Sequence, residues 1–356
     1  MKEPYILIPA FNPAEDLSDY VNTLRSRGFK HILIVDDGSN EKCRNIFNDI
    51  AKIKGCTVIH HAVNLGKGRA MKNGFNYFLN LPNLSEFSGV ITVDSDGQHG
   101  VEDVVKIAEA LKEHPDSLIM GCRDFTLDFV PKKSSFGNKM TCRIFRLLYG
   151  VKLKDTQTGL RGFPTSLIPM FIQLYGERFE LETSILIEAA LKKIPVEEID
   201  IQTIYINNNS ETHFRAIQDS WAIYSLIFKS FFLFICSSLA SFIIDIGMFQ
   251  LFMMFFKRIG MSGAYIVGAT ISARVVSSLF NYFVNKTVVF KNMTGKRSVL
   301  KYYILCVCQM LVSAGSVNGI YHAFHAPEVL IKVVVDSLLF CISYQIQQRW
   351  VFSKKD

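Results

Sequence analysis

The sequence predicts an α/β domain with a largely parallel sheet, followed by an all-α domain of four transmembrane helices. Three observations predict this organisation. Short runs of β-branched residues alternate with amphipathic helical segments in the first half of the chain. Polar residues directly follow several of these runs. Beyond residue 215 the composition changes, and four long apolar segments follow, although the mean hydropathy of the chain is only +0.21.

The first half of the chain reads as alternating strands and helices. Expected strands cover residues 5–9, 31–35, 57–60, 90–93 and 117–120. Expected helices cover residues 15–27, 41–54 and 101–113, and a further helix opens within 64–70. Because each strand is followed by a helix, the strands should run parallel and helices should cover both faces of the sheet.

The strand expected at 90–93 carries the densest group of polar residues at its end. Asp94 and Asp96 lie one residue apart and are followed by Gln98 and His99. Ligands of open α/β sheets bind at this edge. Carboxylate and amide oxygens suit Mg²⁺ or Mn²⁺, which keep coordination positions open for substrate phosphates. The sequence therefore predicts a metal site at Asp94 and Asp96, with a solvated turn as the simpler alternative.

Three other segments end in residues that suit a nucleotide. Asp36 and Asp37 can accept hydrogen bonds from a nucleobase and a ribose, or can cap the next helix. The Gly66-Lys-Gly68 turn lets the backbone approach a phosphate with Lys67 as the cation, or is an ordinary helix start. Arg123 can hold a diphosphate, or is an ordinary surface arginine.

Six motifs occur together in the first 228 residues. They are Pro9-Ala-Phe-Asn12, Asp36-Asp-Gly-Ser39, Asn64-Leu-Gly-Lys-Gly68, Asp94-Ser-Asp-Gly-Gln98, Asp155-Thr-Gln-Thr-Gly-Leu-Arg161 and Ser210-Glu-Thr-His213-Phe-Arg215. In this order the set resembles the family-2 glycosyltransferases with the GT-A fold, and among these the dolichol- or polyprenyl-phosphate sugar synthases. The resemblance covers residues 4–228.

The resemblance implies a role for each matched residue. A nucleotide-sugar donor, UDP-glucose or GDP-mannose, would contact Pro9, Ala10, Asn12, Asp36, Asp37, Lys67, Asp94, Asp96 and Arg123. A divalent cation, Mg²⁺ or Mn²⁺, would be held by Asp94, Asp96 and Gln98. The phosphate of polyprenyl or dolichyl phosphate would lie near Lys132, Lys133, Ser135 and Arg215. The catalytic residues would be Asp96, Arg123 and Arg215.

The chemistry of this transfer sets the residue types that it needs. A cation and arginines would stabilise the charge that develops on the departing nucleotide diphosphate. A lipid monophosphate needs no general base, because its second pKa is about 6 and it is already an anion at neutral pH. One direct displacement would invert the anomeric carbon. Glu180 and Glu182 are alternative candidates for a base or a sugar contact, or are simply charges in the first turn of a helix.

The second half of the chain reads as a membrane domain. Residues 217–228 suggest a helix in the membrane interface, with a core helix as the alternative. The four apolar segments lie near 230–256, 262–285, 298–323 and 328–349, and each reaches the roughly 20 residues that span a bilayer. We therefore expect a catalytic domain at 1–215, an interface helix at 216–229 and a membrane domain at 230–356.

The basic residues predict how the chain lies in the membrane. Lys and Arg gather at one end of the apolar segments, so the positive-inside rule places the catalytic domain and both termini on the cytoplasmic side of the cell membrane. We therefore expect the basic residues behind the formal charge of +7 to face the bilayer surface, and we expect no nucleic-acid partner. The sequence is compatible with a homo-oligomer.

An internal repeat and two charged pairs mark the apolar segments. Residues 282–290 echo residues 344–352, and this pattern resembles the GtrA-like four-helix membrane domain. Asp245 and Arg274 should pair or face the bundle interior, either as a structural pair or in lipid-phosphate binding or transport. Lys332 and Asp336 lie one turn apart and should satisfy each other. The alternative to a transferase is a lipid-linked sugar flippase, or a membrane-bound binding module without transferase activity.

Overall fold

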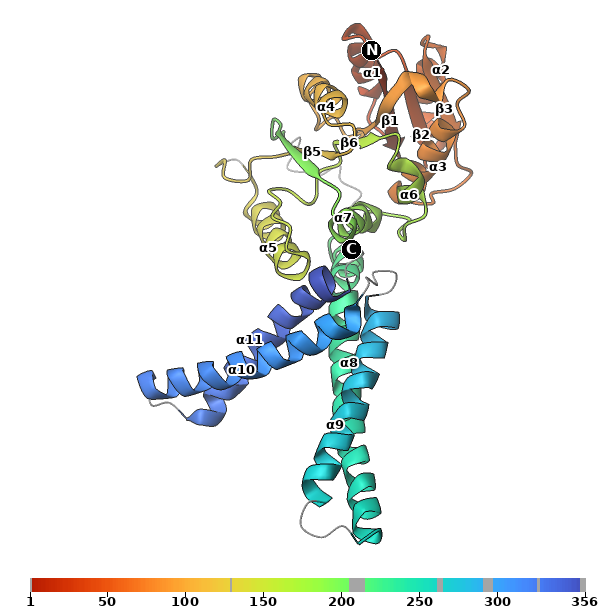
Figure 1. Ribbon diagram of the computed structural model, residues 1–356. Helices are drawn as coiled ribbons and strands as arrows, with labels where there is room; N and C mark the ends of the chain where they lie inside the picture. The colour runs from red at the N-terminus through yellow and green to blue at the C-terminus, as the bar shows by residue number, and fades with distance from the viewer. Residues whose placement is uncertain are drawn as a thin grey trace. The chain divides into compact units, whose positions relative to one another are not determined.

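The computed structural model describes residues 2–128, 130–204, 215–260, 265–290, 297–324 and 327–352. The chain divides into two compact units, unit 1 at residues 1–227 and unit 2 at residues 228–356. Unit 1 combines a sheet with helices, and unit 2 is helical (Figure 1).

Unit 1 is organised around a seven-stranded sheet in the order β3-β2-β1-β4-β6-β5-β7. The strands are β1 Glu3–Ala10, β2 Ile32–Asp36, β3 Cys56–His60, β4 Phe87–Thr92, β5 Leu118–Cys122, β6 Arg161–Pro164 and β7 Val196–Asp200. Strand β6 runs antiparallel to both β4 and β5, and the other pairs are parallel. The predicted largely parallel sheet is confirmed, and all five strands expected from the sequence are present.

Helices cover both faces of this sheet. They are α1 Leu17–Ser26, α2 Arg44–Lys52, α3 Lys67–Leu79, α4 Val101–Glu113, α5 Lys132–Tyr149, α6 Ile168–Ile172 and α7 Glu180–Lys192. On one face, Ile6 and Ile8 of β1 share a buried cluster with Val21 of α1 and Phe47 of α2. Because side chains alternate along a strand, Leu7 points to the other face, where α3 packs directly against it.

The register of the central strands brings their carboxyl ends together. Ala10 of β1 pairs with Asp36 of β2, and the Asp37 amide donates to the Ala10 carbonyl at 2.8 Å. Leu7 of β1 pairs with Thr92, the last residue of β4. The polar residues that follow these strands therefore share one edge of the sheet.

In the part of the chain that the structure describes, four helices are long and apolar enough to cross a membrane. They are α8 Ala216–Arg258, α9 Tyr265–Val284, α10 Ser298–Phe324 and α11 Glu328–Ile346. The predicted segments 230–256 and 298–323 fall within α8 and α10, and 328–349 covers α11 and continues into the turn that follows it. The segment 262–285 covers α9, and its first residues, 262–264, lie outside the described residues. Helix α8 is continuous and contains both the segment expected at the membrane interface, 216–229, and the first apolar segment. Lys291, Lys296, Lys354 and Lys355, which contributed to the predicted orientation, lie outside the described residues.

The internal repeat corresponds to two matching turns of π-helix. These turns, Asn285–Val289 and Gln347–Val351, end α9 and α11. The side-chain amide of Asn285 donates to the Gln347 side-chain oxygen at 3.1 Å. The rings of Phe290 and Phe352 stack with their centroids 5.2 Å apart. The two copies of the repeat therefore pack against each other and close this end of unit 2.

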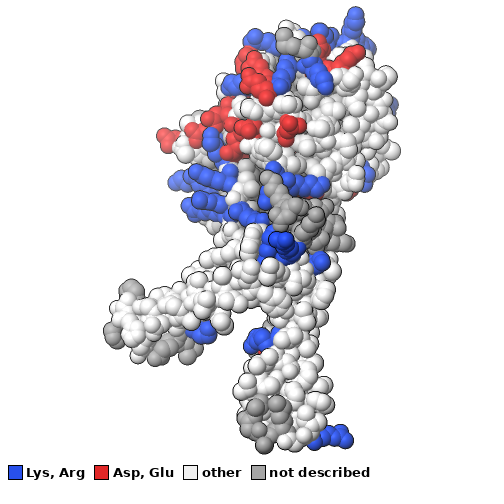
Figure 2. All heavy atoms as spheres, in the orientation of Figure 1, with Lys and Arg blue, Asp and Glu red and all other residues white. Residues whose placement is uncertain are grey.

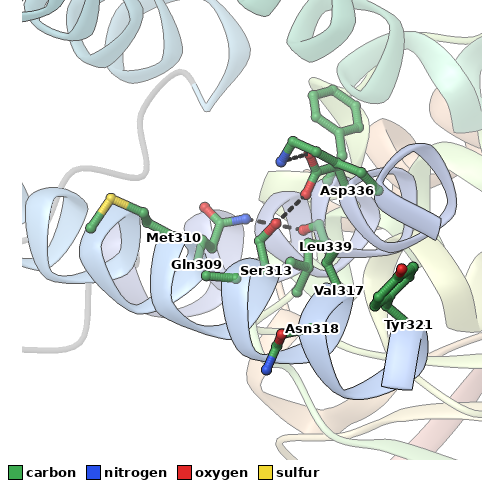
Figure 3. A pocket seen from close by; sticks show the side chains of 11 residues that line it. Gln309, Met310, Ser313, Val317, Asn318, Tyr321, Asp336 and Leu339 are labelled. Atoms are coloured by element: carbon green, nitrogen blue, oxygen red, sulfur yellow. Dashed lines mark hydrogen bonds and ion pairs between the residues drawn. The ribbon is translucent and has the colours of Figure 1, made fainter. Parts of the chain in front are cut away.

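The two charged pairs predicted within the membrane helices are observed. Arg274 lies 3.4 Å from Asp245, whose other oxygen accepts a hydrogen bond from Ser277 at 2.7 Å. In the second hairpin, Lys332 lies 2.8 Å from Asp336, which also accepts a hydrogen bond from Ser313 (Figure 3). This second group lines a cavity of about 690 Å³ between α10 and α11.

Replacing Lys332 with methionine is expected to destabilise unit 2 by up to about 2–3 kcal/mol, because Asp336 loses its ion-pair partner among apolar helices. The double variant Lys332→Met and Asp336→Asn removes both charges and should unfold close to the wild-type temperature. Thermal unfolding of the full chain in lipid nanodiscs measures both. If Lys332→Met and the double variant lose the same stability, the lysine does not compensate the charge of Asp336 among the apolar helices.

Candidate active site

Three elements converge on Asp94. Asp94 follows β4, Lys67 is the first residue of α3, and Glu182 lies in the first turn of α7. The Lys67 ammonium lies 2.6 Å from the Asp94 carboxylate and 2.8 Å from that of Glu182. His99 Nε2 lies 3.3 Å from the second Asp94 oxygen. One lysine thus joins two carboxylates from segments that are distant in the sequence.

The two aspartates differ in their electrostatic surroundings. Burial raises the pKa of the Asp94 carboxyl, but the charges of Lys67 and His99 outweigh this effect and hold the pKa well below its usual range. Burial raises the pKa of Asp96, and the neighbouring negative charge of Asp94 raises it further. Asp96 is therefore the aspartate that a bound cation would stabilise most in its ionised form.

The residues after β4 fit a divalent cation that is shared with a substrate. The backbone amide of Gln98 donates to Asp96 Oδ1 at 3.1 Å, so the turn folds over this carboxylate. His99 Nδ1 is buried and has no hydrogen-bond partner among the described residues. No three His, Cys, Asp or Glu side chains in the described part of the chain form a metal-binding group by themselves. Two carboxylates leave positions for diphosphate oxygens and water, as hard cations require.

The segment 155–161 positions the residues around Asp94. Asp155 is fully buried and accepts hydrogen bonds from Arg123 Nε at 2.7 Å and Arg123 Nη2 at 3.2 Å. A Cβ atom on Gly159 would lie 2.1 Å from an Asp94 carboxylate oxygen, so this glycine makes room for Asp94. Arg161 is also fully buried and donates to three backbone carbonyls. Apart from the family resemblance, the pattern of this segment in the sequence indicates no such role.

Asp37 holds the turn that contains Lys67. One oxygen of Asp37 accepts from His61 Nδ1 at 2.7 Å and from the Leu65 amide at 2.9 Å. The other oxygen accepts from the Gly66 amide at 2.8 Å. The alternative that Asp37 caps the next helix is not observed, since Asn40 is the capping residue there.

Asp36 and Asn12 join the loops after β1 and β2. Asp36 accepts hydrogen bonds from the Ser39 amide and from His60 Nδ1, both at 2.8 Å. Asn12 Oδ1 accepts a hydrogen bond from the backbone amide of Asn40 at 2.9 Å. Together with Pro9 and Ala10 at the end of β1, these residues occupy one edge of the sheet, as the donor-binding prediction requires.

The two glycines beside Lys67 make room for a neighbouring segment. A Cβ atom on Gly66 would lie 2.4 Å from the Glu177 carbonyl, and one on Gly68 would lie 2.7 Å from the Arg178 carbonyl. Gly66 also has φ +103°, which favours glycine. The glycines therefore allow the start of α3 to pack against residues 177–178. The approach of a phosphate to the backbone of this turn stays a prediction.

The residues assigned to the acceptor phosphate lie on two elements. Lys132, Lys133 and Ser135 form the first turn of α5, and the Ser135 hydroxyl donates to the Phe125 carbonyl at 3.1 Å. Arg215 directly precedes α8 and binds Asp219. Among the described residues, no hydrogen bond or ion pair joins the two groups. Residues 210–214 of the last motif, including His213, lie outside the described residues.

Replacing Lys67 with methionine is expected to destabilise unit 1 by about 3–5 kcal/mol, because the carboxylates of Asp94 and Glu182 would be left together without their shared cation. Adding Glu182→Gln removes one of these charges and should recover much of the loss. Thermal unfolding of the full chain in the absence of divalent cations measures both effects. A Lys67→Met protein as stable as the wild type would show that the lysine does not compensate these carboxylates.

Comparisons with known proteins match each half of the chain to a family model. Residues 5–166 match the family model described as glycosyl transferase family 2, and residues 233–352 match the GtrA/DPMS transmembrane domain. The UDP-N-acetylglucosamine–dolichyl-phosphate N-acetylglucosaminyltransferase of Methanococcus voltae is 28% identical over 220 residues, which cover 56% of this chain and 85% of that protein.

Two further relatives show similar identity over less of their own length. The dolichyl-phosphate beta-glucosyltransferase of Saccharomyces cerevisiae is 28% identical over 224 residues, 55% of this chain and 65% of that protein. The polyprenol monophosphomannose synthase of Mycolicibacterium smegmatis is 27% identical over 164 residues, 44% of this chain and 60% of that protein. The predicted resemblance is thus confirmed: residues 5–166 carry a glycosyl transferase family 2 domain, and residues 233–352 carry a GtrA/DPMS transmembrane domain.

Proposed function

We propose that the protein transfers a hexose from a nucleotide sugar to polyprenyl or dolichyl phosphate, with Mg²⁺ or Mn²⁺ and with inversion of the anomeric carbon. The observation that carries this proposal is the pair Asp94 and Asp96 at the end of β4, in a chain that continues into four membrane-capable helices. The named relatives act on dolichyl phosphate or polyprenol monophosphate. Their names give three different sugars, so N-acetylglucosamine joins glucose and mannose as a candidate.

Asp94, Asp96 and Gln98 are the residues that would hold the cation, which would supply positive charge to the diphosphate leaving group. Lys67 is fixed beside Asp94 and would add a second positive charge there. Asp36, Asp37, Asn12, Pro9 and Ala10 occupy the neighbouring edge and would contact the nucleoside. Arg123 is held by Asp155 and would offer its positive charge to the diphosphate.

A phosphate acceptor suits this site better than a sugar hydroxyl, because neither candidate base is available. Glu182 is paired with Lys67. Glu180 accepts hydrogen bonds from the Glu177 and Arg178 amides at 3.0 and 3.3 Å, as a residue in a first helical turn does. An attacking hydroxyl requires a base, whereas a lipid phosphate requires only cations to hold it. Arg215, Lys132 and Lys133 would supply these cations.

Helix α5 presents a surface that suits an anionic membrane. Its exposed positions are Lys132, Lys133, Phe136, Lys139, Arg143, Arg146 and Leu147. These residues recur every three or four positions, and α5 contains no acidic residue. Figure 2 shows lysine and arginine side chains gathered over this part of unit 1. A basic helix with exposed apolar residues binds the anionic cytoplasmic leaflet, which supports a cytoplasmic catalytic unit.

The test is a transfer assay with the purified full chain. Labelled UDP-glucose, UDP-N-acetylglucosamine and GDP-mannose are each offered with a short prenyl phosphate or with the prenol of equal length. The proposal predicts a labelled lipid of inverted anomeric configuration from one donor, and only with the phosphate. Transfer to the prenol would contradict the proposed acceptor. Binding of donor and lipid without any product would favour the flippase or binding-module alternative.

A further inference from the structure

We propose that Arg178 is a second arginine that binds the acceptor phosphate, and that Asp219 positions both Arg178 and Arg215 for this purpose. The inference rests on the proposed function and adds residues that the sequence motifs do not assign. Arg178 lies in the segment between α6 and α7, whereas Arg215 and Asp219 lie at the start of α8. All three belong to unit 1.

One carboxylate faces two guanidinium groups. Asp219 is almost fully buried, with 2% of its side chain exposed. Its Oδ2 atom accepts from the Arg215 amide at 2.7 Å, and its Oδ1 atom lies 3.3 Å from Arg215 Nη2. The same Oδ1 atom lies 3.5 Å from Arg178 Nε. The three groups together carry one excess positive charge, which attracts an anion.

One donor of the Arg178 guanidinium, Nε, is not satisfied within the described structure. This nitrogen is buried, and no described atom accepts a hydrogen bond from it. The 3.5 Å distance to Asp219 is too long for a good hydrogen bond. A buried donor without an acceptor is costly, and guanidinium groups bind phosphate oxygens through paired donors. A phosphate between Arg178 and Arg215 would supply the missing acceptor.

Arg178 is held in place through its backbone and through the first part of its side chain. Its carbonyl packs against Gly68, and its Cγ atom would lie 2.7 Å from a Cβ atom on Gly66. Its amide donates to Glu180. The same Gly66-Lys-Gly68 turn that contacts Arg178 also directs Lys67 to Asp94. Arg178 therefore links the proposed metal end of the site to Arg215, where two phosphate groups must be held close together.

A purely structural role makes a different prediction. In that case Arg178 serves only to neutralise Asp219 and to hold the first turn of α8. The charge-neutral double variant Arg178→Met and Asp219→Asn would then restore whatever Arg178→Met loses. If Arg178 contacts the phosphate, the double variant regains stability but not phosphate affinity.

Calorimetric titration of a short prenyl phosphate into the full chain in detergent tests the inference. Arg178→Met should weaken binding by about 10- to 100-fold, as expected for loss of a charged hydrogen bond. Arg178→Lys should recover part of the affinity. The matched control is Arg69→Met, because Arg69 forms an ion pair with Glu177 beside Arg178 and has no proposed role in binding. The control should bind like the wild type.

The outcomes separate this inference from the proposed function. Wild-type binding with unchanged affinity in Arg178→Met would overturn the inference alone. Full recovery of affinity in the Arg178→Met and Asp219→Asn double variant would also overturn it and would assign a structural role. If the wild type itself does not bind prenyl phosphate, both the proposed acceptor and the inference fail.

Discussion

An Asp96→Ala enzyme is expected to transfer sugar at least about 1,000-fold more slowly than the wild type while keeping its fold, because loss of this carboxylate removes the cation that would stabilise the leaving diphosphate. Asp96 has a raised pKa because it is buried near the negative charge of Asp94. Its removal therefore relieves repulsion and should not destabilise unit 1. Initial rates with saturating donor and acceptor, together with thermal unfolding, measure the two effects.

The matched control for this variant is Asp49→Asn. Asp49 lies on the exposed surface of α2 and pairs only with Lys52 among the described residues. Its replacement should leave transfer unchanged. Near-normal turnover by Asp96→Ala would refute the assignment of Asp96 to the metal. An unfolded Asp96→Ala protein would instead show that this carboxylate has a structural role.

A Gly159→Ala enzyme is expected to lose transfer by at least about 100-fold without unfolding. The added Cβ atom would lie 2.1 to 2.5 Å from three atoms of the Asp94 carboxylate. Since Gly159 is outside the φ range that only glycine favours, the alanine backbone itself is not strained. The Asp94 side chain must therefore rotate away from Lys67 and from the cation. Binding of Mn²⁺, followed by electron paramagnetic resonance, should weaken in parallel with transfer.

Gly137→Ala is the control for a glycine substitution. Gly137 lies in α5, and a Cβ atom there would meet nothing within 4 Å. Alanine also favours the helix, so this variant should be as active and at least as stable as the wild type. If Gly159→Ala is fully active, Asp94 does not need its observed position for transfer.

The sequence predicted those parts of the fold that have strong local signals. The strands β1 to β5 are short apolar runs separated by amphipathic helices, so hydrophobic periodicity was enough to identify them. Strand β6 was missed because Arg161-Gly-Phe-Pro164 contains a glycine and a proline and no apolar run. It forms a strand because β4 and β5 pair with it on both sides.

Only the part of the candidate site with a strong local signal was predicted from the sequence. The Asp94 and Asp96 pair is local in sequence and follows a clear strand. The partners of the site are distant: Lys67 and Glu182 are paired across 115 positions, and Asp155 holds Arg123 across 32. Such contacts arise only when the chain folds. Gly66 and Gly68 were likewise given a phosphate-binding meaning, although their small size serves the packing of residues 177–178.

The most direct test of the account is the effect of divalent cations on transfer by the wild-type chain. After treatment with EDTA, the enzyme should form no lipid-linked sugar from a nucleotide sugar and a short prenyl phosphate. Adding back Mg²⁺ or Mn²⁺ should restore the reaction. Undiminished transfer in EDTA would contradict the claim that a cation held by Asp94 and Asp96 stabilises the departing nucleotide.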